Sequence, residues 1–197
     1  MVRLCLSKPS VLLLGITIDW KLNFNTHVNM LCTKATKKIN ALYRLRSKLT
    51  STQKLVLYNS FIMSIFNYCP VIWMFCGKVA NNKIDKIQKK ALQALYDDFL
   101  SSHEELLRKG NHLTIHEMNK RHLLIQVYKC INKENPSFLN ELFETKNPTY
   151  NLRTKSTLSL PKTSTLSWGL HSVIYRGSRS WNSLPDDIKN SSSSKKV

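Results

Sequence analysis

The sequence has few acidic residues: Asp and Glu total 12 of 197 residues, Lys and Arg total 30, and the formal net charge is +18. Residues 1–100 contain 15 basic and 4 acidic side chains, and residues 101–197 contain 15 and 8. The basic surplus therefore runs along the whole chain and is no tail on a neutral domain. A charge of this size favours polyanionic partners, such as nucleic acid or an anionic membrane face.

Cysteine and glycine patterns typical of several kinds of site are also missing. The five cysteines are widely spaced and contain no C-x-x-C pair, which argues against a zinc ribbon or a redox motif and favours a reducing interior. The chain has five glycines and no recognisable Gly-rich phosphate loop or nucleophile elbow. We therefore expect no enzymatic activity from this chain alone, no cofactor and no small-molecule substrate.

Long uninterrupted hydrophobic runs are absent. The most apolar stretch, residues 55–76, is interrupted by Asn59, Ser64, Asn67 and Pro70, so a membrane span is not expected. The N-terminal apolar run lacks a small-residue cleavage site, which argues against a signal peptide. These features predict an intracellular protein, nuclear or cytoplasmic.

The apolar content of 42% is sufficient for one large core or two small ones. Residues 11–18 are rich in branched aliphatic side chains and predict a buried strand, followed by a turn at 19–25. Only weak strand candidates follow, near 157–160 and 171–175. The pairing partners of the first strand are therefore expected upstream of residue 1.

Three long helices are predicted in the next part of the chain. Apolar residues recur at steps of three and four over 26–49 and 82–96, so each of these helices has one apolar side. Between them, a helix starting near Ser51 is apolar almost all round until Pro70 bends or ends it. This middle helix is predicted to form the centre of the core.

Shorter helices are predicted after residue 100. Three residue pairs fit the capping box, in which a hydroxyl and a carboxylate satisfy first-turn amides. They are Ser101 with Glu104, Ser102 with Glu105, and Thr114 with Glu117. The predicted helices span 103–109, 115–132 and 138–143. After Lys146 the composition predicts extended or irregular structure with a disordered Ser-rich end. The expected fold class is therefore mainly α, with a short N-terminal strand and a weakly β C-terminal region.

The segment Tyr96-Asp97-Asp98-Phe99 resembles a polymerase metal site, because paired aspartates beside an aromatic residue can hold two metal ions. In such sites the pair lies on a hairpin, whereas here it follows a Lys-rich amphipathic helix. Asp19, the other carboxylate that follows a strand, has no further support as a metal ligand. We therefore favour a helix end over a metal site.

Three histidines, at positions 112, 116 and 122, also invite a metal interpretation, because H-x-x-x-H spacing places two imidazoles on one helix face. His112 precedes the capping Thr114 and so lies outside the helix, and the H-E-x-x-H spacing is absent. A structural or surface role is favoured for these histidines.

The basic helix faces are the remaining candidate site. Lysines at helical spacing usually form a solvated face, but the +18 charge raises nucleic-acid contact to an equal alternative. The candidate binding residues are Lys34, Lys37, Arg44, Lys48, Lys86, Lys89 and Lys90. Tyr43, Tyr58 and Trp73 could stack on bases, although large aromatic residues at these positions are more often part of the core.

Five sequence landmarks follow one another along nearly the whole chain. They are L-G-I-T-I-D at 14–19, F-N-Y-C-P-V-I-W at 66–73, I-x-x-I-Q-x-x-A-L at 84–92, Y-N-L-R at 150–153 and G-S-R-S-W-N-S-L-P at 177–185. In their order and spacing they resemble the C-terminal part of jockey-like non-LTR retrotransposon reverse transcriptases, which are RNA-directed DNA polymerases. The resemblance implies a fragment of such a transposable-element enzyme.

The same resemblance implies a division of the chain. Residues 1–19 would end the palm-like strand region, 20–100 would form a helical thumb that contacts the template-primer duplex, 101–146 would be a post-thumb helical region, and 147–197 an extended C-terminal segment. The palm, whose aspartates hold Mg²⁺ in the parent polymerase, and the endonuclease would precede residue 1. The chain alone would then be non-catalytic.

Two other functions are left open by the sequence. The chain could be a decayed remnant without selected activity, which behaves as an interaction-prone or aggregation-prone basic protein. It could also be a membrane-associated basic protein, an alternative that depends on residues 55–76.

Overall fold

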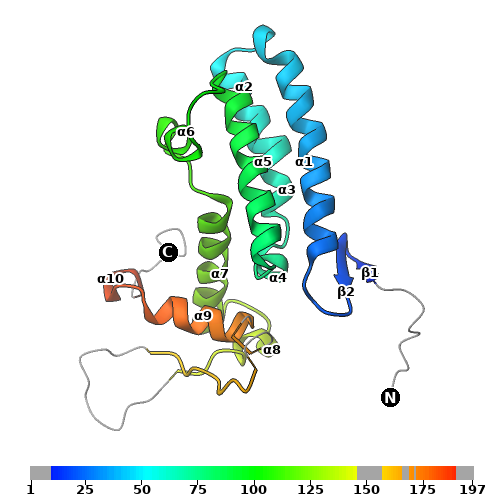
Figure 1. Ribbon diagram of the computed structural model, residues 1–197. Coiled ribbons are helices and arrows are strands. Elements are labelled where there is room, and N and C mark those ends of the chain that lie inside the picture. Colours follow the sequence, from blue (N-terminus) through cyan, green and yellow to red (C-terminus); the bar gives the residue numbers. More distant parts are fainter. Residues whose placement is uncertain (1–9, 146–156, 166–168, 171, 190–197) are drawn as a thin grey trace. The chain divides into compact units, whose positions relative to one another are not determined.

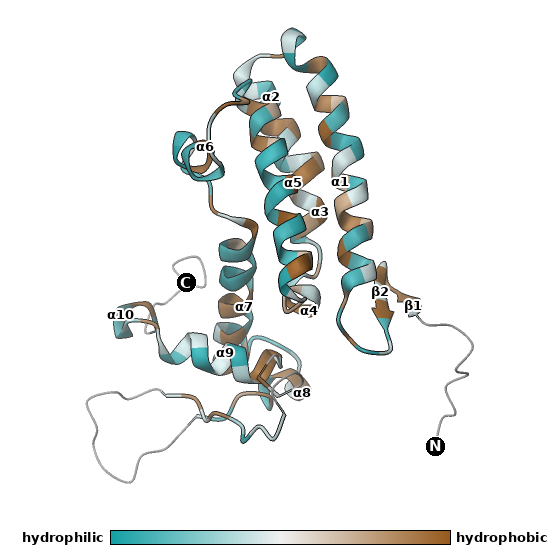
Figure 2. Ribbon diagram, in the orientation of Figure 1, coloured by the Kyte–Doolittle hydropathy of each residue, from teal (hydrophilic) through white to brown (hydrophobic). Residues whose placement is uncertain are grey.

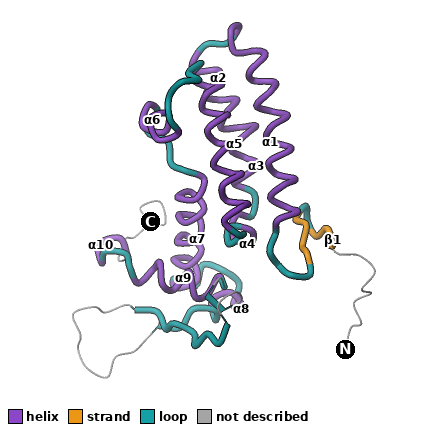
Figure 3. The backbone as a smooth tube through the Cα atoms, viewed as in Figure 1, coloured by secondary structure: helices purple, strands orange, loops and turns teal. Residues whose placement is uncertain are grey.

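The computed structural model describes residues 10–145, 157–165, 169–170 and 172–189. The chain divides into two compact units, Met1–Glu117 and Met118–Val197, called here the first and second unit. The described residues are mainly helical, with one short two-stranded sheet near the N-terminus (Figure 3). This confirms the predicted fold class. The predicted disordered Ser-rich end lies outside the described residues.

The first unit begins with an antiparallel hairpin of β1 (Ser10–Leu13) and β2 (Ile16–Asp19). The prediction of one buried strand over 11–18 was wrong, because the chain turns back at Leu14 and Gly15, both of which have positive φ. Two successive positive φ angles match the turn that best suits a two-residue hairpin. The strand therefore pairs within residues 10–19, and β1 is largely exposed.

Asp19 organises the turn between the hairpin and the first helix. Its carboxylate accepts hydrogen bonds from the backbone N–H groups of Lys21, Asn23 and Phe24, at 3.0, 3.2 and 2.8 Å. These bonds hold the chain in the left-handed conformation at Phe24, from which α1 (Asn25–Leu45) starts. The two carboxylate oxygens are thus occupied by backbone donors, which gives this residue a conformational role.

The helix α1 buries the side that the sequence periodicity predicted. Val28, Leu31, Ala35, Ile39 and Leu42 are at most 5% exposed. The helix continues into a short 3-10 turn, η1 (Arg46–Lys48), before the chain becomes extended at Leu49. The predicted helix over 26–49 is therefore confirmed apart from its last turn.

The predicted middle helix consists of three consecutive parts. They are α2 (Ser51–Leu57), the π-helical segment η2 (Tyr58–Met63) and α3 (Ser64–Asn67). Tyr58, Ile62 and Phe66 are buried, whereas Val56 and Phe61 are 56% and 51% exposed. The segment contributes to the core, as predicted, but one side of it is exposed although the sequence is apolar almost all round.

Pro70 starts a further helix, because its ring fixes a φ suited to the first helical position and its missing N–H is not needed there. That helix is α4 (Pro70–Trp73), and Trp73 is fully buried with its indole N–H donating to the carbonyl of Tyr68 at 3.1 Å. Tyr68 in turn donates its hydroxyl to the carbonyl of Leu14 at 2.8 Å, which ties this segment to the hairpin.

The third predicted helix is α5 (Lys78–Tyr96), which begins four residues earlier than expected. It packs against α1, and Ile84, Ala91, Leu92 and Leu95 form its buried side. Figure 2 shows apolar and polar residues alternating along both helices, as expected when one side faces a core and the other faces water.

Two of the three predicted capping boxes are confirmed. Ser102 and Glu105 cap α6 (His103–Lys109), and Thr114 with Glu117 caps α7 (Ile115–Ile131). The Ser101–Glu104 box does not form, because the Ser101 hydroxyl instead donates to Asp98 at 2.8 Å.

Gln88 connects α5 to the start of α7. Its buried amide donates to the carbonyl of Leu113 at 2.9 Å and accepts from the N–H of Ile115 at 3.0 Å. Because buried backbone groups are costly when left without a partner, this single side chain fixes the entry into α7.

The second unit is built from short segments. They are the later part of α7, α8 (Ser137–Asn140), an isolated bridge between Thr145 and Leu158, α9 (Val173–Asn182) and α10 (Asp186–Lys189). The weak strand candidate near 171–175 was wrong from Val173 onward, because Val173 starts a helix that the Ser172 hydroxyl caps by accepting from the N–H of Tyr175. The helix predicted at 138–143 is present but ends at Asn140. In the described part of the chain, no helix is both long and apolar enough to cross a membrane.

Candidate nucleic-acid interface

The predicted cations on α1 lie on its outer side. Lys37 and Arg44 are exposed nearly opposite the buried row that includes Ala35 and Leu42, and Lys34 is exposed on the flank of that row. Lys48 is exposed in the following 3-10 turn. Figure 1 shows α1 running alongside α5, which carries the remaining predicted cations. The packing of the two helices therefore places the predicted cations of α1 and those of α5 in one helical bundle.

On α5, Lys86 and Lys90 are exposed one turn apart, and Lys89 is half-buried. Lys83, one turn before Lys86, was not among the predicted residues. Its ammonium donates to the side-chain carbonyl of Asn29 on α1 at 2.8 Å. This bond fixes the spacing of the two helices on their solvent side, so Lys83 positions the neighbouring cations.

Carboxylates are unevenly distributed relative to these cations, because no acidic residue occurs from position 20 to position 84. The helix α1 and the segments from α2 to α4 consequently carry no negative side chain. The absence of acidic residues from 20 to 84 can be read from the sequence. The prediction of the interface did not include it, because that prediction considered only the net charge. The field around α1 is therefore positive without local compensation.

The acidic residues that the first unit does contain are engaged elsewhere. Asp85 is 3.0 Å from the imidazole of His116, and Glu104 pairs with Arg108 at 3.5 Å. The others cap helices or turns, or pair with Arg46, Lys54 and Lys109. Among the described residues, none of the seven predicted cations forms an ion pair, so their charge is available to a polyanion.

The Asp97-Asp98 pair lies at a helix end, as the sequence analysis favoured. Asp97 follows the last residue of α5 in the left-handed conformation, and its carboxylate pairs with Arg46 at 2.9 Å and with the buried ammonium of Lys54. Asp98 accepts from the N–H and the hydroxyl of Ser101, which lowers the pKa of its carboxyl to about 2. With both carboxylates committed in this way, the residues present do not fit the Mg²⁺ site of a polymerase.

Arg46 forms a small exposed cluster that sequence reasoning missed. Its guanidinium lies 3.7 Å from the ring centre of Tyr43 and 5.5 Å from that of Phe99. Tyr43 and Phe99 are 44% and 43% exposed, whereas Tyr58 and Trp73 are core residues. Of the three aromatic residues considered for base stacking, Tyr43 is therefore the exposed one, with Arg46 over its ring.

Of the three histidines considered as metal ligands, His112 and His116 have other contacts. The His112 ring nitrogen is 2.7 Å from the Tyr96 hydroxyl and its ring lies 5.4 Å from that of Tyr58. Burial lowers the pKa of His112, which favours the neutral ring. Within the residues that the structure describes, no group of three or more His, Cys, Asp or Glu side chains could hold a metal ion.

The candidate interface consists, then, of cations without ion pairs on two packed helices, next to one exposed tyrosine. Comparison of the chain with models of protein families, with curated proteins and with solved structures finds no match.

Proposed function

We propose that the first unit is a non-catalytic nucleic-acid-binding module that derives from the thumb of a jockey-like retrotransposon reverse transcriptase and contacts a template-primer duplex. The observation that carries the proposal is the set of cations on α1 and α5 without ion pairs, in a stretch with no carboxylate from 20 to 84. Lysine and arginine side chains on such a face release counterions from a phosphate backbone, which supplies the binding free energy.

Binding to a labelled RNA/DNA duplex tests this proposal by fluorescence anisotropy over a series of salt concentrations. The logarithm of the affinity should fall linearly with the logarithm of the salt concentration. A variant with Lys37, Arg44, Lys86 and Lys90 each changed to Gln should bind more weakly. For this variant, the slope of log affinity against log salt should become less steep by about 0.9 for each phosphate that it no longer neutralises.

A matched control removes the same number of charges from exposed residues of the second unit, by changing Lys120, Arg121, Lys133 and Lys162 to Gln. This variant should keep the slope of the unchanged protein. Absence of duplex binding at low salt, an affinity independent of salt, or equal effects of the two variants would each contradict the proposal.

A second candidate, a remnant without selected activity, is favoured by one specific observation. The hairpin exposes Val11, Leu12, Leu13 and Leu14 by 55–82%, and Trp20 beside them by 72%. Exposed apolar residues on a strand edge promote association and aggregation. Leu12→Lys should then suppress concentration-dependent aggregation, measured by light scattering, and a monodisperse unchanged protein would argue against this candidate.

A further inference from the structure

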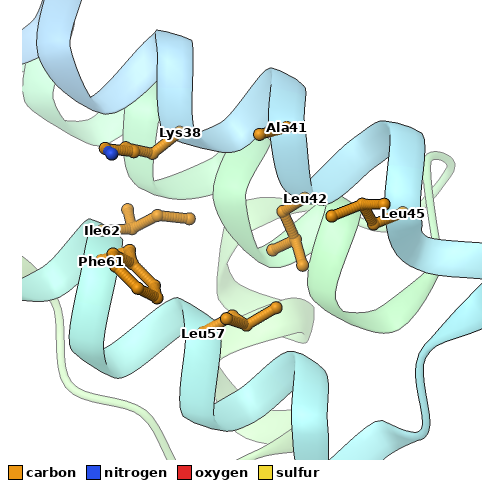
Figure 4. A pocket seen from close by; sticks show the side chains of 7 residues that line it. All are labelled: Lys38, Ala41, Leu42, Leu45, Leu57, Phe61 and Ile62. Carbon is orange, nitrogen blue, oxygen red and sulfur yellow. The ribbon is translucent and has the colours of Figure 1, made fainter.

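A groove lies between α1 and the α2–η2–α3 segment of the first unit. Its narrower part has a volume of about 210 Å³, and Figure 4 shows side chains from both helices around it. It is lined by Lys38, Ala41, Leu42, Leu45, Leu57, Phe61 and Ile62. A wider hollow of about 510 Å³ shares three of these residues and adds Lys34, Lys37, Ser60, Ser64 and Ile65. The two hollows form one continuous groove along α1.

The floor of this groove is apolar and accessible. Leu57, Phe61 and Ile65 follow one another at steps of four residues, so they form one stripe along the helical segment. Phe61 is 51% exposed, and Leu45 on the facing helix is 48% exposed.

The rim of the groove is positively charged. Lys34, Lys37 and Lys38 line it from α1, and the Lys38 ammonium lies 5.5 Å from the ring centre of Phe61. The opposite side contributes Ser60 and Ser64. No carboxylate lines either hollow, and none occurs in the sequence between 20 and 84. The groove therefore has an apolar floor and a cationic rim.

We propose that this groove binds an amphipathic helix of a partner protein, with its apolar side against Phe61, Leu57 and Leu45 and its acidic residues against the lysines of the rim. Helices with spaced apolar anchors commonly bind in such grooves. The distance along α1 from Lys34 to Leu45 is about 16 Å at 1.5 Å per residue, which matches three turns of helix. The charge of the rim selects an acidic helix over a basic one.

A second copy of this chain is a poor occupant. Among the described helices, α1 and α9 contain no acidic residue, and α5 and α7 contain one each against five and three basic residues. The helix α6 has only seven residues, with Leu106 and Leu107 buried. A nucleic-acid strand fits less well, because unpaired bases stack on aromatic rings and Phe61 is the single aromatic side chain that lines the groove.

The acidic helix would share Lys34 and Lys37 with the proposed nucleic-acid interface. The two ligands would then compete, and the partner would reduce duplex binding at these two residues. The proposal that the groove binds an acidic helix is based on the apolar floor and the cationic rim, and it does not depend on the proposed duplex binding. Failure of one proposal is therefore distinguishable from failure of the other.

The experiment uses the full chain and a fluorescein-labelled, helix-forming peptide of about 16 residues, with leucines spaced three and four residues apart and glutamates on the flanks. A scrambled peptide of equal composition has no apolar stripe. The first peptide should bind, and the scrambled one should bind at least about tenfold more weakly, because it lacks the apolar stripe. The two peptides have the same charge, so charge cannot cause this difference.

Three variants locate the site. Phe61→Ser removes the exposed anchor and Ala41→Trp fills the groove, and each should weaken peptide binding by about tenfold or more. Val56→Ser is the matched control, because Val56 is an exposed apolar residue of the same segment that does not line the groove. Circular dichroism verifies that each variant keeps its helix content.

Equal binding of the two peptides, equal binding by all three variants, or no peptide binding up to about 1 mM would overturn the proposal. It would also be overturned if Phe61→Ser weakened binding of a single-stranded oligonucleotide but not of the acidic peptide. Lys38→Gln, which removes one rim charge, should weaken peptide binding and reduce its salt dependence.

Discussion

The two units of the chain differ in how many residues define each core. The first unit buries regularly spaced residues along α1 and α5, so each buried position is one of many in a repeating pattern. Among the described residues, the core of the second unit is a cluster of seven buried residues from α7, α9 and the segments between them, including Val127, Phe143, Leu158 and Trp181. Removal of one core side chain should therefore affect the second unit more, relative to its total core, than the first.

Removal of the buried tryptophan of the second unit should have the largest effect. Trp181 is 2% exposed, and Trp181→Ala should lower the free energy of unfolding by about 3–5 kcal/mol. A decrease of this size exceeds what a small core usually supplies, so we expect the second unit to unfold. Hydrogen exchange should show reduced protection in α9 and in the later part of α7.

The comparison predicts that α1 and α5 keep their protection in the same variant. Simultaneous loss of protection in both units would show that they form one cooperative unit, and the difference between the two cores would then have no consequence for stability.

The second prediction concerns the first unit, where loss of one buried polar side chain should lower the stability. Gln88→Leu leaves the carbonyl of Leu113 and the N–H of Ile115 without their partner, which should cost at least about 2 kcal/mol because each orphaned buried group costs about 1–3 kcal/mol. Urea denaturation followed by circular dichroism measures this change. Gln93→Leu on the same helix is the control and should cost about 1 kcal/mol or less, because its side chain donates one exposed hydrogen bond, to the carbonyl of Phe99 at 3.3 Å. Equal effects would show that Gln88 is not a special connection.

A glycine in the second unit should have a smaller effect. A Cβ at Gly177 would lie 2.9 and 3.0 Å from two ring carbons of Phe143 and 3.0 Å from a methyl carbon of Val127. Gly177→Ala should therefore destabilise the second unit by about 1–3 kcal/mol through overpacking.

Gly77→Ala is the matched control for Gly177→Ala, because a Cβ at Gly77 would meet no atom within 4 Å. Thermal unfolding of the two variants measures the difference. Phe143→Leu should partly restore the stability of Gly177→Ala by freeing space, and no restoration would mean that the contact with Phe143 is not the cause.

The sequence allowed correct prediction of features that depend on local patterns. The apolar spacing in α1 and α5 and the capping pair Ser102–Glu105 require only residues within one helix, and they were confirmed. The exposure of the predicted cations, apart from the half-buried Lys89, follows from the same spacing. The hairpin was missed because its turn places Leu14, a residue that rarely adopts positive φ, beside Gly15.

Features that depend on residues far apart in the sequence could not be predicted. Lys54 looks like any other lysine of a basic chain, yet it pairs with Asp97, 43 residues away. The helix α9 has a glycine in its middle, which lowers its intrinsic helix propensity, and it forms because Gly177 fits closely against Phe143.

The smallest expected effect concerns the pH dependence of the first unit, through His27. Its side chain accepts a hydrogen bond from the N–H of Thr17 at 3.3 Å, which links β2 to α1. Burial, followed by the charge of Lys34, lowers the pKa of His27 from its usual value of 6.5. The unfolded chain therefore takes up a proton before the folded one, so the free energy of unfolding should decrease as the pH falls below 6.5, until it reaches the pKa of the folded state.

His27→Gln retains a hydrogen-bond acceptor that does not titrate, so its stability should change less between about pH 7.5 and 5.5 than that of the unchanged protein. Denaturation at several pH values measures this, because the other histidines with lowered pKa, at 103, 112 and 122, contribute equally to both proteins. Exchange of the Thr17 amide should accelerate towards pH 5.5 relative to that of Gln88 only if protonation releases β2 from α1. An identical pH dependence in both proteins would show that His27 accepts its proton without disturbing the hairpin. The first unit would then tolerate loss of the hydrogen bond between Thr17 and His27, as its repeating core predicts.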